Sequence, residues 1–366
     1  MKTFALTIIA ALFATSAYAA EIPKRVQKKI LAGAPAIDLN SDGAISVEEL
    51  KAGRDKLPEN MRVLLDAYLD TQGGATKRSE PARHKTTLPK PRESNGSTPF
   101  IDPIFKYEEI ENITYGTAKS GDTTMPLLLD VYRPVASAQL PNKLPAMIFA
   151  FGGGWRKGSK DTKYIRDFCE YFAERGYVAI SIQYRIAKDN PPPQPGPAPN
   201  PEANDLYRLM NAAFQDTCDA VRWVRTNAAK YNIDPNRIGV GGVSAGAVNA
   251  LSVGFCDDNI TGPGAEVAAV ISLMGAVGAN HIDKNDPPVF IAHGTSDNVV
   301  HYAMVKSMVQ QLETVKAEYS FYPVDGVAHR LQTILDTKFD GKTVRDHSLD
   351  FCFEAMKLGE LIKESR

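Results

Sequence analysis

The stretch of sequence that decides the fold is Gly242-Val-Ser-Ala-Gly246. An apolar segment expected to form a β-strand, 238–243, runs directly into it, and residues 247–255 have the pattern of a helix. Glycines permit the strained turn that joins a strand to a helix over so few residues. Such a turn presents the Ser244 hydroxyl above the free N–H groups and positive dipole of a helix N-terminus. The stretch therefore predicts a nucleophilic serine in an α/β protein.

Outward from this turn, short apolar segments alternate with amphipathic helices from Phe100 onward. This alternation is typical of a largely parallel sheet with helices on both faces. The sequence predicts an eight-stranded, mostly parallel sheet, with strands over 112–117, 126–132, 147–151, 178–184, 238–243, 267–273, 289–293 and 318–322.

Three further segments lie where this architecture would bring them near Ser244. Phe151-Gly-Gly-Gly-Trp155 ends one strand, and glycine loops of this kind turn backbone N–H groups toward a developing negative charge. Asp297 follows the strand that ends at His293, and His329 follows the final strand. The order Ser, Asp, His is the one expected for a nucleophile, its orienting acid and its base in this architecture.

Other titratable residues offer alternatives to this set or have plainer roles. Asp325, four residues before His329, is the alternative acid. The remaining histidines have plainer interpretations: we expect His293 to pack at a strand end, His301 and His347 to lie on helix surfaces, His281 to lie in a loop and His84 to be solvated.

Taken together, these motifs resemble the α/β-hydrolase superfamily, from about residue 107 to the end. The resemblance is to its esterase/lipase branch with an HGGG loop, which includes hormone-sensitive-lipase-like and feruloyl/acetyl-esterase-like enzymes. Further matching segments are 129–134, 184–185, 234–238, 293–294 and 300–302. The chain departs from the family at Phe151, where a histidine is usual, so the way in which the glycine loop is held is an open point.

The resemblance implies a carboxylesterase/lipase-type serine hydrolase with no catalytic cofactor. Ser244 would attack an ester carbonyl, His329 would transfer the proton and Asp297 would orient the imidazole. The amides of Gly153, Gly154 and Ala245 would form the oxyanion hole, and Trp155 would line the substrate cleft. The expected substrate is a small-molecule or polysaccharide-linked ester. The alternatives are a peptidase of the same superfamily and a calcium-binding secreted protein whose hydrolase fold is catalytically silent.

The first residues have the layout of a secretory signal peptide. Lys2 precedes an apolar run over 4–14, and Ala17-Tyr-Ala19 offers a small-residue cleavage site. A signal over 1–19 predicts a secreted or periplasmic protein without stable membrane insertion; the alternative is a retained anchor.

An EF-hand-like loop follows. Oxygen ligands would come from Asp38, Asn40 and Asp42, from the backbone carbonyl of Ala44 and from Glu49, with Gly43 at the sharp turn. The loop resembles the EF-hand family and implies a structural Ca²⁺ ion; the plainer alternative is a surface turn that binds nothing. We expect a module over 20–60, a linker over 61–99 and a catalytic domain over 100–366.

The four cysteines of an exported chain could form two disulfides, and sequence alone allows three pairings. They could equally be small buried hydrophobes. The helix arrangement implied by the resemblance favours Cys169 with Cys352 and Cys218 with Cys256.

Composition limits the class of protein. The chain has 366 residues, 42 Lys+Arg against 43 Asp+Glu and a formal net charge of −1, which argues against an electrostatic nucleic-acid binder. Hydrophobic residues make up 43%, enough for a full core and too many for a disordered chain. Seven of the 24 prolines fall in 191–201, so this segment is expected to be an extended surface excursion, either lining a cleft or acting as a spacer.

Overall fold

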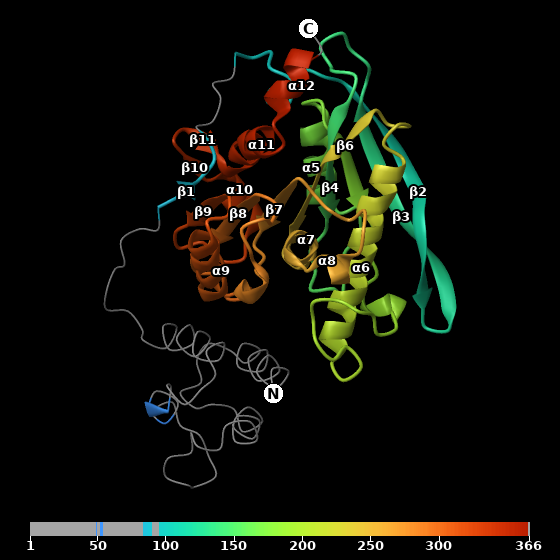
Figure 1. Cartoon of the computed structure of the whole chain (residues 1–366), viewed down its shortest axis with the longest axis vertical. Coiled ribbons are helices and arrows are strands. Elements are labelled where there is room, and N and C mark those ends of the chain that lie inside the picture. Colours follow the sequence, from blue (N-terminus) through green and yellow to red (C-terminus); the bar gives the residue numbers. More distant parts are fainter. Residues whose placement is uncertain (1–48, 50–51, 54–82, 90–94, 365–366) are drawn as a thin grey trace. The chain divides into compact units, whose positions relative to one another are not determined.

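The computed structural model describes Glu49, residues 52–53, 83–89 and 95–364 (Figure 1). The chain divides into two units between Pro81 and Ala82, and the unit Ala82–Arg366 contains all the strands of the described residues. The expected signal peptide and most of the expected EF-hand-like loop lie outside the described residues. Glu49 alone among the expected calcium ligands is described; it lies in a helical segment and is buried.

One large sheet organises the unit. Its nine strands in the described residues follow the order β1-β9-β8-β7-β6-β4-β5-β3-β2. Strands β4 to β9 run parallel, whereas β3 runs antiparallel to β5, β2 to β3, and β1 to β9. The strands are β1 (Lys85–Thr86), β2 (Tyr107–Ser120), β3 (Thr123–Pro134), β4 (Leu144–Ala150), β5 (Val178–Ile182), β6 (Ile233–Val243), β7 (Ala269–Leu273), β8 (Val289–Gly294) and β9 (Tyr319–Val324).

The predicted fold class is confirmed, since each of the eight predicted strands overlaps one of β2 to β9. Strands β4, β5, β7, β8 and β9 are buried along their whole length, as expected where helices cover both faces of a parallel sheet. The ninth strand was not predicted. β1 lies within the segment expected to be a linker, 61–99, and is too short and too polar to give a strand signal.

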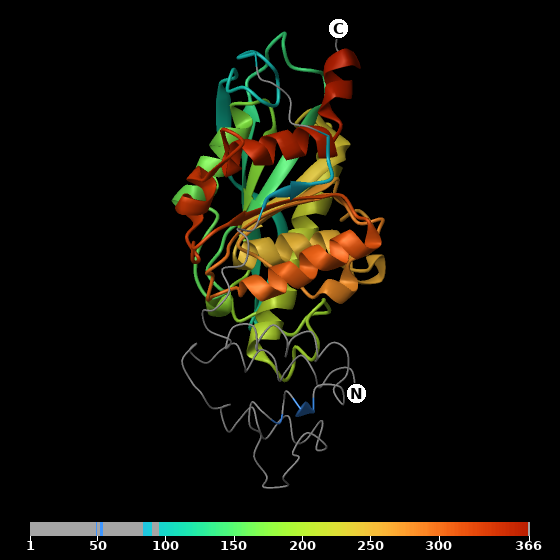
Figure 2. The ribbon, with the colours of Figure 1, turned by 90° about the vertical axis from the view of Figure 1, so that its left-hand side faces the viewer.

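Helices cover the sheet on both sides (Figures 1 and 2). The right-handed crossover from β4 to β5 carries α5 to one face, and the crossovers from β5 to β6 and from β6 to β7 carry α6 and α7 to the other. α11 lies beside α5, because the Tyr171 hydroxyl of α5 donates to Asp346 of α11 at 2.6 Å. The helices are α5 (Lys163–Ala173), α6 (Asp205–Thr226), α7 (Ala245–Phe255), α8 (Asp258–Thr261), α9 (Tyr302–Val315), α10 (Leu331–Asp336), α11 (Val344–Ala355) and α12 (Leu358–Glu364).

Shorter elements complete the unit. The 3₁₀ turns η3 (Ala187–Asp189) and η4 (Ala279–His281) lie in connections between strands, and β10 (Lys338–Phe339) pairs with β11 (Lys342–Thr343) in a separate two-stranded ribbon. None of the helices in the described ranges has the length and hydropathy that a bilayer crossing requires.

Strand β1 ties the end of the predicted linker, 61–99, to the edge of the sheet. Beyond the backbone pairing with β9, the Thr86 and Ser320 hydroxyls are 2.7 Å apart. His84 stacks on Tyr322 with ring centroids 5.5 Å apart, so it is not the solvated residue that was expected. These contacts hold part of the predicted linker against the catalytic sheet.

The four cysteines all lie in the described ranges and all are free thiols, so neither Cys169–Cys352 nor Cys218–Cys256 is bonded in the structure. Cys169, Cys218 and Cys352 are completely buried in the core. Burial raises the pKa of Cys218 to about 12 and that of Cys256 to about 11. Little thiolate is therefore present to enter disulfide exchange, and the cysteines behave as small hydrophobes.

Candidate active site

Three side chains from three separate loops form one hydrogen-bonded chain. Ser244 stands between β6 and α7, Asp297 follows β8 and His329 follows β9. The Ser244 Oγ lies 3.0 Å from His329 Nε2, and His329 Nδ1 lies 2.6 Å from Asp297 Oδ2. The imidazole is 19% exposed, whereas the carboxylate has no exposed surface. The structure thus brings together all three residues that the sequence predicted for the triad.

The turn that carries Ser244 depends on its two flanking glycines. A Cβ on Gly242 would lie 2.3 Å from the backbone of Gly246, and a Cβ on Gly246 would lie 2.1 Å from the Ala150 carbonyl oxygen. No side chain fits at either position. Ser244 itself has φ 54° and ψ −117°, a conformation that L-residues rarely adopt. Two other non-glycine residues with positive φ, Trp155 and Met274, follow the neighbouring strands β4 and β7. Such backbone strain concentrates at functional sites.

Three hydrogen bonds reach the Asp297 carboxylate. The backbone amides of Val299 and Val300 donate to Oδ1 at 2.8 and 3.0 Å, and His329 contacts Oδ2. Burial acts to raise the pKa of Asp297, but the hydrogen bonds from His329 and these amides outweigh it, so its pKa is lowered. The carboxylate is therefore ionised at neutral pH, as an orienting acid requires. The alternative acid, Asp325, accepts a hydrogen bond from the Thr295 hydroxyl at 3.1 Å.

His293 is more than a packing residue at the end of β8. Its Nε2 lies 2.8 Å from the Val300 carbonyl oxygen and 3.3 Å from Asp297 Oδ2, and the side chain has no exposed surface. Burial lowers the pKa of His293, so the ring is neutral and its Nε2–H faces both oxygens. Its Nδ1 is buried and has no hydrogen-bond partner among the described residues, in keeping with the unprotonated nitrogen of a neutral ring. Sequence reasoning missed this contact.

The glycine loop that begins at Phe151 is held by aromatic contacts and hydrogen bonds in the absence of the usual histidine. The Phe151 ring stacks on Tyr184 with centroids 4.1 Å apart and planes 10° apart. The Tyr184 hydroxyl donates to the Phe151 carbonyl at 2.6 Å, and the Gly152 amide donates to the Tyr164 hydroxyl at 2.8 Å. Gly158 closes over the other side, where a Cβ would meet the Phe151 ring at 2.5 Å. Aromatic packing and two tyrosine hydroxyls therefore fix the loop.

The expected oxyanion donors lie in this loop and at the start of α7. Gly153 and Gly154 have φ of 130° and 62°, and among the described residues their amides have no hydrogen-bond acceptor. Ala245 is the first residue of α7. The role of these three amides stays a prediction.

Trp155 is 9% exposed, and its indole Nε1 donates to Asn249 Oδ1 of α7 at 2.9 Å. This contact joins the glycine loop to the helix that follows Ser244. Its expected place in the wall of a substrate cleft stays a prediction.

The proline-rich segment is anchored from α6. Asn211 donates to the carbonyls of Gln194 and Ala198 and accepts from the Ala198 amide at 2.9 Å, and the Gln215 side chain donates to the Pro195 carbonyl. Asn211 is 1% exposed. The excursion is therefore attached at several points to a helix of the core, whereas its extended conformation and its role as cleft wall or spacer stay predictions.

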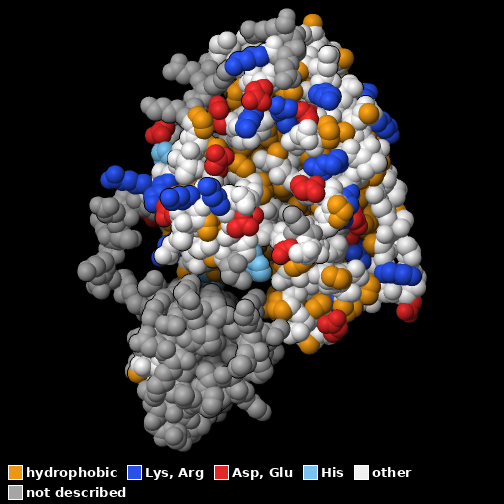
Figure 3. Space-filling view, in the orientation of Figure 1, with side chains coloured by type: hydrophobic (Ala, Val, Ile, Leu, Met, Phe, Trp, Pro, Cys, Tyr) orange, Lys and Arg blue, Asp and Glu red, His pale blue; other side chains and the backbone are white. Residues whose placement is uncertain are grey.

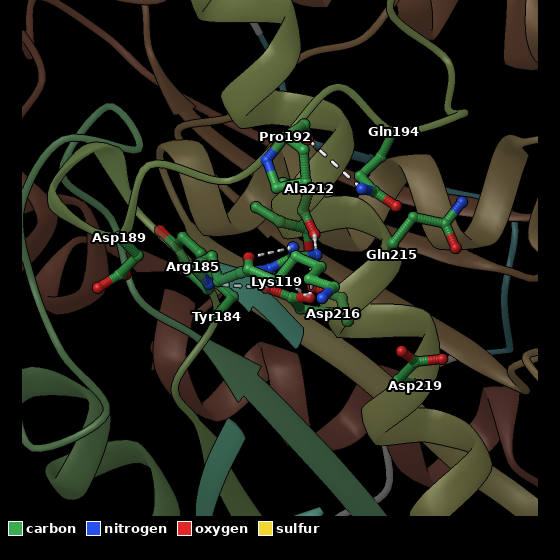
Figure 4. A network of polar contacts seen from close by, with 12 residues as sticks. Lys119, Tyr184, Arg185, Asp189, Pro192, Gln194, Ala212, Gln215, Asp216 and Asp219 are labelled. Atoms are coloured by element: carbon green, nitrogen blue, oxygen red, sulfur yellow. Dashed lines mark hydrogen bonds and ion pairs between the residues drawn. The ribbon is translucent and has the colours of Figure 1, made fainter. Parts of the chain in front are cut away.

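Beside it, a buried ion pair joins three parts of the chain (Figure 4). Arg185, just after β5, contacts Asp216 of α6 through Nη2 at 2.7 Å and Nε at 2.9 Å, and the Arg185 amide donates to the same carboxylate at 2.8 Å. Its Nη1 donates to the Lys119 carbonyl of β2 at 3.1 Å. Since Arg185 is 4% and Asp216 1% exposed, the network fixes the loop that leaves β5 at the active-site end of the sheet.

Acidic and basic side chains both spread over the face of the catalytic unit seen in Figure 3. This distribution is in keeping with a net charge near zero. No group of three or more His, Cys, Asp and Glu side chains that could hold a metal ion occurs within the described ranges.

Comparisons with known proteins find similarity to esterases. The BD-FAE family model matches residues 129–195 and 207–277. Esterase LipC of Mycobacterium tuberculosis (strain ATCC 25618 / H37Rv) is 24% identical over 262 residues, 59% of this chain and 59% of that protein. Chlorogenic acid esterase of Aspergillus niger is 30% identical over 182 residues, 47% of this chain and 32% of that protein. The chain thus spans less than two thirds of the length of these relatives.

Two solved structures share the arrangement of elements. A truncated form of a carbohydrate esterase from gut microbiota has a TM-score of 0.53 at 22% identity, with 72% of this chain and 99% of that chain covered. Esterase 2 of Thermogutta terrifontis, phosphoramylated by tabun, has a TM-score of 0.50 at 23% identity, with 69% and 92% covered. With this sheet order and these structural relatives, the chain has the α/β-hydrolase fold.

Proposed function

We propose that the chain is a secreted serine carboxylester hydrolase. The observation that carries the proposal is the continuous contact from Ser244 Oγ through His329 to Asp297, at 3.0 and 2.6 Å. The esterases among its relatives support the reaction class, and the signal-peptide pattern supports export.

The geometry accounts for both halves of such a reaction. The Ser244 Oγ attacks the ester carbonyl carbon while its proton passes to His329 Nε2, which forms a tetrahedral oxyanion. Collapse of this adduct breaks the bond to the alcohol, which leaves with the proton from His329. A water molecule then repeats the sequence on the acyl-enzyme and releases the carboxylic acid. Asp297, ionised and buried, stabilises the imidazolium in each half.

For the substrate, we propose a small-molecule or polysaccharide-linked ester. A carbohydrate esterase among the structural relatives and a chlorogenic acid esterase among the sequence relatives support this class. We further propose that the EF-hand-like loop binds a structural Ca²⁺ ion through Asp38, Asn40, Asp42, the Ala44 carbonyl and Glu49, which the ligand spacing supports.

The test uses p-nitrophenyl acetate with wild type, Ser244→Ala and Ser296→Ala. Ser296 is exposed and lies next to Asp297, so its substitution controls for a change of the same kind near the site. We expect hydrolysis by wild type and Ser296→Ala, and only background from Ser244→Ala. Equal rates from all three proteins would refute the proposed function and favour a catalytically silent hydrolase fold.

A further inference from the structure

The Tyr164 hydroxyl lies at the base of the candidate active site. Tyr164 is in the first turn of α5, and its oxygen accepts the Gly152 amide at 2.8 Å. Gly152 packs directly on the nucleophile turn: a Cβ built on it would lie 3.2 Å from the Ser244 Cβ and 3.4 Å from the Tyr164 Oη. The tyrosine oxygen and the serine side chain therefore border the same point in space.

The hydroxyl proton of Tyr164 is not used in a hydrogen bond within the described part of the chain. A tyrosine O–H both donates and accepts. The Gly152 N–H occupies an acceptor position, and within the described part of the chain the Tyr164 proton has no acceptor. Burial raises the pKa of Tyr164 more than the bond from Gly152 lowers it, so the proton is retained at neutral pH. The side chain is neither fully buried nor fully exposed. A neutral donor thus borders the same Gly152 position as the Ser244 side chain.

The hydrogen bond from Gly152 makes the Tyr164 hydroxyl a stronger donor. An O–H group whose oxygen already accepts an N–H is polarised, and this makes it a better donor. The Gly152 amide itself is engaged by the tyrosine and is not free to bind an oxyanion. The Tyr164 hydroxyl proton is therefore the donor that this hydrogen bond leaves available.

The platform beneath Tyr164 is rigid. The loop that leads into α5 is held by Lys160, whose Nζ contacts Asp130 at 2.7 Å with both side chains almost fully buried. The Lys160 amide donates to the Gln183 side chain at 3.2 Å, and the Thr162 hydroxyl donates to the Ser159 carbonyl at 2.8 Å. A donor acts on a transition state only if its position is fixed before the reaction, and these contacts fix it.

We propose that Tyr164 is a catalytic residue whose hydroxyl donates a hydrogen bond to the oxyanion formed when Ser244 adds to the ester carbonyl. The inference rests on the proposed function. The proton stays on the tyrosine throughout, so no further acceptor is needed. The hydroxyl acts together with the amides expected from Gly153, Gly154 and Ala245.

The experiment compares p-nitrophenyl acetate with p-nitrophenyl thionoacetate in wild type, Tyr164→Phe and Tyr171→Phe. Sulfur accepts hydrogen bonds weakly, so a lost oxyanion donor slows the oxygen ester far more than the sulfur analogue. We expect kcat on the acetate to fall by about 10²-fold in Tyr164→Phe, the range seen when one oxyanion donor is removed, with KM little changed and a much smaller fall on the thionoacetate. Tyr171, on the same helix, donates to Asp346 and serves as the matched control.

The outcomes separate the two proposals. Equal falls on both substrates would show that Tyr164 only positions the glycine loop, and an unchanged rate would show no role; either overturns the inference while leaving the esterase intact. A wild type as inactive as Ser244→Ala would overturn the proposed function and the inference with it. Should Tyr164→Phe fail to fold, 3,5-difluorotyrosine at 164 keeps the ring and the acceptor oxygen. Its activity should fall as pH rises through its ionisation, and a flat profile would contradict donation.

Discussion

Replacing Asp216 with asparagine removes the negative charge from an enclosed ion pair and leaves its shape almost unchanged. Three donors of Arg185 end on this carboxylate, the nearest at 2.7 Å, and the two residues are 4% and 1% exposed. Asparagine has one oxygen and one NH₂ group in place of the two carboxylate oxygens. The Arg185 guanidinium would stay buried, lose its counter-charge and face the asparagine NH₂, which is itself a donor. Loss of one partner of a buried pair costs about 3–5 kcal/mol.

Urea unfolding at neutral pH measures this cost. With an m value of about 3 kcal/mol/M, a loss of about 3–5 kcal/mol moves the midpoint down by about 1–1.7 M. The matched control is Asp167→Asn, which breaks the exposed pair with Lys163 on α5 and should shift stability by less than about 0.5 kcal/mol.

A double variant isolates the cause. Arg185→Met with Asp216→Leu removes both charges and fills the site with apolar volume, so it should recover most of the loss. If Asp216→Asn costs less than about 1 kcal/mol, or if the double variant is no more stable than the single one, an uncompensated buried charge is not what destabilises the protein and the reasoning is refuted.

Three other predictions concern His293, Gly158 and the calcium loop. Burial lowers the pKa of His293, so below pH about 6.5 the unfolded chain binds a proton that the folded chain does not bind, and the folded state loses stability as pH falls. The free energy of unfolding, measured with urea at pH 5.5 and 7.5, should therefore differ less between the two pH values in His293→Gln than in wild type. Gly158→Ala should lower the melting temperature clearly, since its φ is +107° and the new Cβ would meet Phe151, whereas Gly326→Ala, with φ +69° and open space, should cost less; equal shifts would contradict the packing argument. Calcium should raise the melting temperature of wild type but not that of Asp38→Ala. If calcium shifts neither melting temperature, the proposal that the loop binds Ca²⁺ is wrong.

The sequence predicted those parts of the site that local motifs encode. Ser244, Asp297 and His329 each follow a strand in a short recognisable segment, so their order and spacing sufficed. Tyr164 and Tyr184 were not assigned roles, because what they do depends on contacts with the glycine loop that no local pattern records.

The sequence also did not show which polar residues would be buried by segments distant in the chain. His347 was expected on a helix surface, which is wrong: it is 3% exposed, and its Nε2 lies 2.8 Å from the Phe339 carbonyl. Helical periodicity shows which face is apolar, but it does not show that the β10–β11 ribbon packs over a polar position of α11. The same holds for β1, two residues whose strand character comes only from β9.

Strand β1 also changes what a shortened protein would be. A chain begun at residue 100, the expected start of the catalytic domain, would lack β1 and the contacts of Thr86 and Thr87 with β9. Strand β9 would then present a bare row of N–H and C=O groups, a template on which another strand can add. In the full chain β1 covers this edge of the sheet, and it thereby protects the protein against self-association through β9.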